Sequence, residues 1–157
     1  MNAYRIRPLK YPWPTVFYLV AVLAALGLER ILPLNLPEHR QLLLQISGAI
    51  IGLSGFYLIF WASITLYRHR TAMLSNRSAA RLVICGPFRF TRNPIYLGYT
   101  LLTLGTGLFT GIGWIAIAAI AAATATHLYV IRKEEMHLLA RFGYEFERYC
   151  RRTRVWI

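Results

Sequence analysis

Long apolar runs without charge are the feature of this sequence that most constrains its fold. No charged residue lies between Arg40 and Arg68, and none lies from Ile95 to Ile131. A helix needs roughly 20 apolar residues to cross a membrane, so the second run is long enough for two crossings joined by a tight turn. The sequence therefore predicts an all-α, polytopic bundle of about four transmembrane helices in a single domain. The expected crossings are residues 13–32, 41–67, 94–109 and 112–131.

The second and fourth crossings carry strips of small residues. Gly48, Gly52 and Gly55 leave one side of the second crossing open to close approach by another helix, and alanine dominates the fourth. We interpret both strips as helix-packing surfaces rather than chemical sites.

The overall composition agrees with an integral membrane protein. The 157 residues are 57% hydrophobic and 15% charged, which excludes a disordered chain. Two cysteines, Cys85 and Cys150, exclude a disulfide scaffold, and both are expected to be free thiols. The net charge of +12 could indicate nucleic acid binding, but such proteins need no long apolar runs. Anionic lipid headgroups are the expected partners, and no nucleic acid is expected.

The distribution of basic residues predicts the orientation in the membrane. Of the 18 Lys and Arg residues, two lie in the loop 29–41. The others precede the first crossing, occupy the loop 68–93, or follow the fourth crossing, where a helix is expected over 132–152. By the positive-inside rule these parts, including both ends of the chain, face the cytoplasm.

The loop 68–93 leads into an unusual run of residues, GPFRFTRNPIYLG, at positions 86–98. A Gly-Pro pair forces a turn at its start, and Pro94 falls in the first turn of the third crossing, where its missing N–H costs nothing. Free amides at such a helix start can bind an anion or a cofactor carboxylate. Alternatively, Arg89 and Arg92 contact lipid phosphate and the remaining residues cap the helix. Local chemistry leaves both interpretations open.

The charged segment after the fourth crossing is expected to form an amphipathic helix. Glu135 begins an apolar stripe at helical spacing, and Arg132 lies within reach of it for an ion pair. The other members of the stripe are Leu139, Phe142, Phe146 and Tyr149. A carboxylate on this face would be partly desolvated, which favours either a cationic ligand or a structural ion pair. Periodicity does not choose between the two.

Motifs of several familiar enzyme classes are absent from the sequence. The chain has no Asp, and it lacks a dinucleotide fingerprint, a phosphate-binding loop, an HExxH motif and a nucleophile elbow. Its histidines form no ligand pattern, so no metal site is expected. These histidines are His39, His69, His127 and His137.

Two blocks of the sequence carry a family resemblance. The first is the 86–98 run, and the second is Glu134-Glu135 followed by Arg141-Phe142-Gly143. Together they resemble the isoprenylcysteine carboxyl methyltransferases and related phospholipid methyltransferases, which are small integral membrane enzymes that use S-adenosylmethionine. The resemblance covers residues 82–157.

The resemblance implies a cofactor, a substrate class and a set of site residues. S-adenosylmethionine would donate a methyl group to a lipophilic or prenylated acceptor, such as an isoprenylcysteine-like carboxylate. Glu135 and Arg141 would be catalytic, with Arg141 near the substrate entrance. The residues implied to frame the cofactor are Gly86, Arg89, Arg92, Asn93, Pro94, Tyr96, Leu97, Gly98, Glu134 and Glu135. A desolvated glutamate and an aromatic face would both favour the sulfonium cation.

The chain departs from the family pattern at two positions, and two other functions stay open. Asn93 stands where the family often has histidine, so an amide replaces a titratable ring. Phe146 stands where tyrosine is common. The alternatives are an NADPH-dependent membrane reductase related to sterol reductases, and a noncatalytic four-helix membrane protein. In the noncatalytic protein Glu134, Glu135 and Arg141 would form an ion-pair network.

Overall fold

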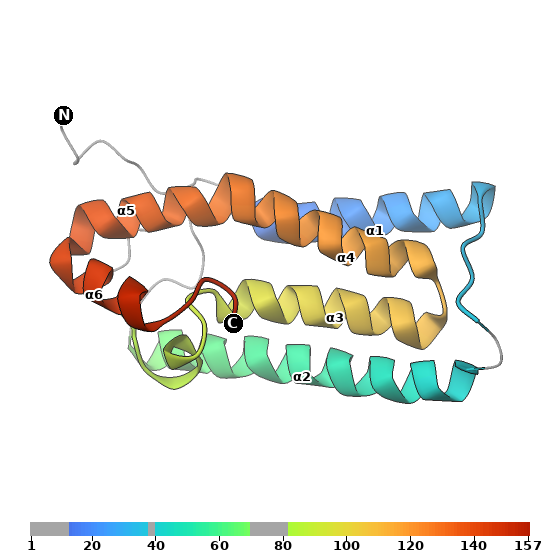
Figure 1. The fold of residues 1–157 in the computed structure, drawn as a ribbon, viewed down its shortest axis with the longest axis horizontal. Coiled ribbons are helices and arrows are strands. Elements are labelled where there is room, and N and C mark those ends of the chain that lie inside the picture. Colours follow the sequence, from blue (N-terminus) through green and yellow to red (C-terminus); the bar gives the residue numbers. More distant parts are fainter. Residues whose placement is uncertain (1–12, 38–39, 70–81) are drawn as a thin grey trace.

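The computed structural model describes residues 13–37, 40–69 and 82–157 (Figure 1). Every regular element in the described part of the chain is a helix, as the sequence predicts, and two isolated β-bridges lie outside the helices. The basic residues predicted to precede the first crossing, His39, and residues 70–81 of the predicted loop lie outside the described residues. The elements are α1 (Trp13–Ile31), α2 (Gln41–Arg68), the 3-10 turn η3 (Gly86–Arg89), α3 (Pro94–Thr110), α4 (Gly113–Thr126), the π-helical turn η4 (His127–Ile131), α5 (Arg132–Phe142) and α6 (Tyr144–Arg152).

Within the described part of the chain, three helices are long and apolar enough to cross a membrane. They are α1, α2 and the continuous helix Gly113–Phe142, which contains α4, η4 and α5. Helix α3 has 17 residues and spans about 25 Å, which is shorter than the roughly 30 Å of a typical hydrocarbon core. The structure therefore supports an integral membrane protein with three candidate spans, and a full crossing by α3 stays a prediction.

The long helices pack side by side in the order α2, α3, α4 and α1. Helix α3 lies between α2 and α4 (Figure 1), and α1 packs against α4 and also contacts α3 through Tyr18. The α1–α2 connection and the α3–α4 turn lie at one end of this bundle. The turn η3, helices α5 and α6, and the C-terminus lie at the other end. The two sequence blocks that resemble the methyltransferases therefore meet at one end of the bundle.

Glycines bring the backbones of α2 and α3 into direct contact. A Cβ atom on Gly105 would lie 2.6 Å from the carbonyl oxygen of Gly48, and one on Gly55 would lie 2.7 Å from the carbonyl oxygen of Gly98. Backbone atoms cannot rotate away from such contacts. The predicted strip of small residues in α2 is therefore a helix-packing surface.

The C-terminal helix differs from the prediction in two respects. Helix α5 continues α4 through η4 instead of beginning a separate helix at residue 132. The prediction of one helix over 132–152 is also wrong, because Gly143 has a φ of 51° and ends α5 before α6 begins. Glycine adopts positive φ without the steric cost that a side chain adds. The chain can therefore turn back at this residue, which places α6 beside α5 (Figure 1).

Replacing Gly105 with alanine should loosen the bundle. The added methyl group would meet the backbone of α2, and overpacking of this kind costs about 1–3 kcal/mol. Gly27→Ala in α1 is the matched control, since nothing lies within 4 Å of the methyl group that it adds. Thermal unfolding in detergent should show a lower midpoint for Gly105→Ala and no decrease for Gly27→Ala. Equal midpoints would show that the α2–α3 contact contributes little to stability.

Candidate functional site

The start of α3 is held against the C-terminal tail of the chain. Thr91 and Arg154 form an isolated parallel bridge, in which the Arg92 backbone N–H donates to the Arg154 carbonyl at 2.9 Å. The Val155 carbonyl accepts two more hydrogen bonds, from the Thr91 hydroxyl at 3.0 Å and from the Asn93 side-chain amide at 3.2 Å. The amide that replaces the family's usual histidine therefore anchors the tail.

Helix α6 is fixed to η3 by a buried tyrosine. The Tyr149 hydroxyl donates to the Phe88 carbonyl at 2.6 Å, and burial raises the pKa of Tyr149 above its ordinary value. Phe146, which the family commonly replaces with tyrosine, is buried beside it. Leu139, in contrast, is 41% exposed. The predicted apolar stripe is thus divided at the break between α5 and α6, and its buried part belongs to α6.

Glu135 forms an ion pair with Arg92 across the two sequence blocks. One guanidinium nitrogen of Arg92 lies 3.0 Å from Oε1 of Glu135, with the side chains 13% and 29% exposed. The sequence predicts that Arg132 lies within reach of Glu135 for an ion pair, but the structure joins Glu135 to a residue that precedes α3. The Nε atom of Arg92 is buried and has no hydrogen-bond partner among the described residues.

A second polar contact joins the same two blocks. The hydroxyl of Tyr96, in the first turn of α3, donates to Oε1 of Glu134 at 2.8 Å. Glu134 lies in the first turn of α5, next to Glu135. The structure therefore brings together four of the predicted site residues, Arg92, Tyr96, Glu134 and Glu135, from two separate segments of the chain. We refer to these four residues as the charged cluster.

The other predicted cofactor residues lie in turns or at contacts between helices. A Cβ atom on Gly98 would lie 2.8 Å from the carbonyl oxygen of Gly55, so this glycine lies at the α2–α3 contact. Gly86 begins η3 with a φ of 60°. Pro94 is buried in the first turn of α3, and Leu97 is half-buried one turn later. These residues shape the helix start that carries Arg92 and Tyr96, and their contact with a cofactor stays a prediction.

The two remaining predicted arginines are exposed. Arg89 ends η3, and the Arg141 guanidinium lies 5.8 Å from the centre of the Phe142 ring. Arg141 is seven residues beyond Glu134, which corresponds to about 10 Å along the axis of α5. The structure therefore does not join Arg141 to the charged cluster, and its predicted place at the substrate entrance stays a prediction.

Two features near the cluster were not identified from the sequence. Thr126, Val130 and Ile131 are almost fully buried at η4, and the rings of His127 and Trp156 lie 6.3 Å apart. A π-helical turn is frequent at functional sites but has no simple sequence signature. The sequence gives only a weak indication that the C-terminal tail packs against the protein. Val155 and Trp156 are apolar residues that follow a run of arginines.

The charged cluster has the chemistry of a site for an organic ion. Two carboxylates can hold a cation, and the guanidinium of Arg92 can donate hydrogen bonds to an anion. Within residues 13–37, 40–69 and 82–157, no group of three or more His, Cys, Asp and Glu side chains is placed to hold a metal.

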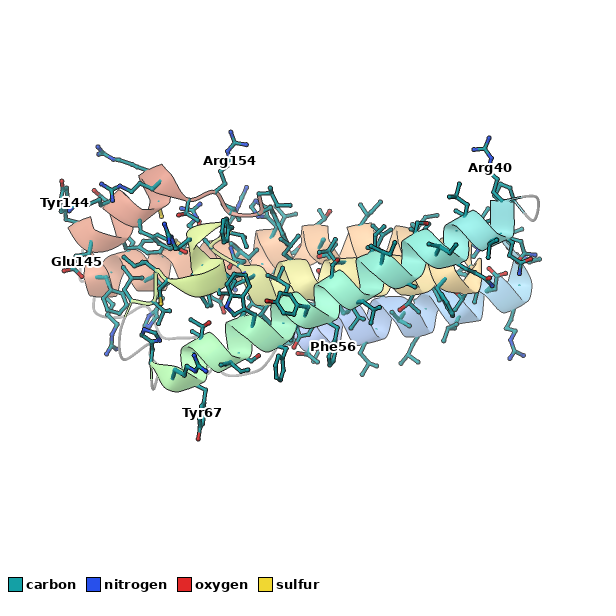
Figure 2. All side chains as sticks on the ribbon, turned by 90° about the horizontal axis from the view of Figure 1, so that it is seen from below. Arg40, Phe56, Tyr67, Tyr144, Glu145 and Arg154 are labelled. Carbon is teal, nitrogen blue, oxygen red and sulfur yellow. The ribbon has the colours of Figure 1, made fainter. Side chains whose placement is uncertain are left out.

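Replacing Glu135 with glutamine should destabilise the protein. The substitution leaves the partly buried charge of Arg92 without its partner. Loss of the partner of a fully buried charge costs about 3–5 kcal/mol of folding stability. Because this pair is partly exposed, we expect a loss of about 1–2 kcal/mol. Glu145→Gln is the control, because Glu145 is exposed on α6 (Figure 2). Unfolding in detergent should show a lower stability for Glu135→Gln alone. A result equal to the control would show that the ion pair contributes no stability.

Alkaline pH should destabilise the contact between α6 and η3. Because burial raises the pKa of Tyr149, the stability from its neutral hydroxyl is fully present below about pH 10 and is lost as the pH rises beyond that value. Tyr149→Phe should reduce this alkaline loss, while lowering the neutral-pH stability by about 1 kcal/mol through the unpaired Phe88 carbonyl.

The measurement is unfolding as a function of pH in a Cys150→Ser background, since burial also raises the pKa of Cys150. Tyr144→Phe is the matched control, because Tyr144 is exposed. An identical alkaline profile for both tyrosine variants would contradict the role given to Tyr149.

Comparison with known proteins agrees with the two sequence blocks. The phospholipid methyltransferase family matches residues 43–145, which include the whole charged cluster. The nickel-cobalt-cadmium resistance protein NccN of Alcaligenes xylosoxydans xylosoxydans is 39% identical over 82 residues, which are 51% of this chain and 37% of that protein. This chain thus spans little more than a third of that relative, and no solved structure matches it. The chain belongs to the phospholipid methyltransferase family, as the resemblance of its two blocks predicted.

Proposed function

We propose that this protein transfers a methyl group from S-adenosylmethionine to a lipophilic acceptor. The observation that carries the proposal is the meeting of the two blocks at one end of the bundle, through the Arg92–Glu135 ion pair and the Tyr96–Glu134 hydrogen bond. Methyltransferases of this family use S-adenosylmethionine. The distribution of Lys and Arg supports a cytoplasmic position for this end of the bundle.

The charges of the cluster fit those of the proposed cofactor. S-adenosylmethionine carries a sulfonium and an amino group, which are cationic, and a carboxylate. Glu134 and Glu135 would hold the cationic groups, and the ring of Tyr96 would add a cation–π attraction. The buried Nε–H of Arg92, which has no partner among the described residues, would donate to the carboxylate. An unpaired buried donor costs about 1–3 kcal/mol, so a bound anion there would be stabilising.

The residues of the cluster would act mainly by positioning. When bound, the cofactor supplies a methyl group on a positively charged sulfur. Because methyl transfer is an in-line displacement, the protein has to align the acceptor with that group. The ion pair and the tyrosine hydrogen bond hold α5 against the start of α3 at two points. Arg92, Tyr96 and the two glutamates therefore form a preorganised frame.

The amide at position 93 supports a carboxylate as the acceptor. Asn93 cannot take up a proton near neutral pH, and its side chain is engaged by the Val155 carbonyl. An ammonium acceptor must lose a proton before it can be methylated, whereas a carboxylate needs no general base. We therefore favour an isoprenylcysteine-like carboxylate or a similar lipid-like acid. The apolar side chains that α1 and α2 expose would face lipid, so such an acceptor would enter from the bilayer.

Glu134→Gln provides the sharpest test of this function. The glutamine keeps an oxygen that can accept from Tyr96 but removes the charge that would attract the cofactor. Calorimetry on detergent-purified protein should detect binding of S-adenosylmethionine and of its demethylated product, and no binding of NADPH. Glu134→Gln should weaken binding of S-adenosylmethionine by roughly tenfold, or about 1.4 kcal/mol. Glu145→Gln is the control and should bind like the original protein.

The outcomes separate the three functions that the sequence left open. Binding of NADPH alone would indicate a reductase. No binding of either cofactor would indicate a noncatalytic membrane protein. After saturable binding of S-adenosylmethionine, transfer of a labelled methyl group to a prenylated cysteine but not to phosphatidylethanolamine would support the carboxylate acceptor, and the reverse preference would contradict it.

A further inference from the structure

Cys85 and His69 form a pair of side chains that the proposed methyl transfer does not use. The Sγ atom of Cys85 lies 3.5 Å from Nε2 of His69, and Nδ1 of His69 lies 2.9 Å from the Thr65 carbonyl oxygen. A carbonyl oxygen only accepts hydrogen bonds, so this contact assigns the ring proton to Nδ1 and the lone pair to Nε2. The thiol of Cys85 then donates to Nε2. The ring is held in the tautomer that can take the thiol proton.

The position of His69 favours that proton transfer. His69 follows the last residue of α2, and its backbone N–H also donates to the Thr65 carbonyl, at 3.2 Å. These two hydrogen bonds to one carbonyl hold the ring at the end of α2, with Nε2 facing Cys85. Cys85, His69 and the Thr65 carbonyl therefore make up a nucleophile, a base and a group that orients the base.

The surroundings of Cys85 indicate an apolar electrophile. Cys85 immediately precedes η3, which packs against α2, a candidate membrane span. The neighbouring Ile84 and Phe90 are 53% and 70% exposed, and Tyr67 near the end of α2 is also exposed (Figure 2). Large apolar side chains at the end of a span are suited to contact with lipid, and a hydrocarbon chain attached at Cys85 would lie among them. Cysteines next to membrane spans are common sites of S-acylation.

We propose that Cys85 accepts a long-chain acyl group from acyl-coenzyme A, with His69 as the base. The Sγ atom forms a bond to the carbonyl carbon, and the bond between that carbon and the donor sulfur breaks. The thiol proton passes to Nε2 of His69 and then to the departing coenzyme A thiolate. One thioester thus replaces another, and neither an oxidant nor a reductant is needed. The step does not depend on the proposed methyl transfer.

The two cysteines of the chain provide an internal comparison. Burial raises the pKa of Cys150, so this thiol stays protonated and should react slowly. Incubation of the detergent-purified protein with palmitoyl-coenzyme A should give one hydroxylamine-labile palmitoyl adduct by mass spectrometry. The adduct should persist in Cys150→Ser and disappear in Cys85→Ser. His69→Gln should slow its formation by about tenfold or more.

A second readout keeps the proposal testable if His69→Gln unfolds. In the original protein, iodoacetamide should alkylate Cys85 faster in the native state than in the denatured state, and should alkylate Cys150 more slowly in the native state. Equal palmitoylation of both cysteines, or an unchanged rate in folded His69→Gln, would overturn the proposal. A native Cys85 that is alkylated no faster than the denatured one would also overturn it, and the pair would then be a helix cap.

Discussion

The Arg92–Glu135 ion pair determines how the end of the bundle is arranged. Both side chains are mostly buried, and a buried charge without a partner is costly, so α5 must lie beside the residues that begin α3. Once this contact exists, Glu134 is placed within reach of Tyr96 in the first turn of α3. The pair thus joins two motifs that are distant in sequence into one cluster.

The bundle keeps the two halves of that cluster in fixed positions. On one side, glycine contacts hold α3 directly against α2, so the start of α3 has little freedom to shift. On the other side, α5 carries the two glutamates and continues the axis of α4 without an intervening loop. The C-terminal tail lies next to the start of α3, because the Val155 carbonyl accepts hydrogen bonds from Thr91 and Asn93. Helix packing and the tail therefore support the cluster in addition to its own polar contacts.

Much of the fold, but less of the site, could be predicted from the sequence. The starts of the four apolar helices and the ends of the first three lie within one residue of the predicted bounds, because charges or turn residues flank each apolar run. The fourth helix instead continues to Phe142, eleven residues beyond its predicted end. Ion-pair partners were not predictable, since Arg132 is closer in sequence to Glu135 than Arg92 is. The prediction of one apolar stripe depended on an unbroken α-helix over residues 132–152, and Gly143 breaks that helix. The π-helical turn η4 lies between α4 and α5 and has more residues per turn than an α-helix. The face on which each α5 side chain lies therefore cannot be extrapolated from α4.

The unbroken helix Gly113–Phe142 has a consequence for the influence of lipid on the site. Its 30 residues extend about 45 Å, whereas a typical hydrocarbon core is roughly 30 Å thick. Glu134 and Glu135 lie in the first turn of α5, just after the apolar part of this helix. A thicker or thinner bilayer would tilt the helix or change how far it protrudes, since mismatch between helix and bilayer is relieved in these ways. The distance between the carboxylates and the headgroup layer is thereby set by the membrane as well as by the protein.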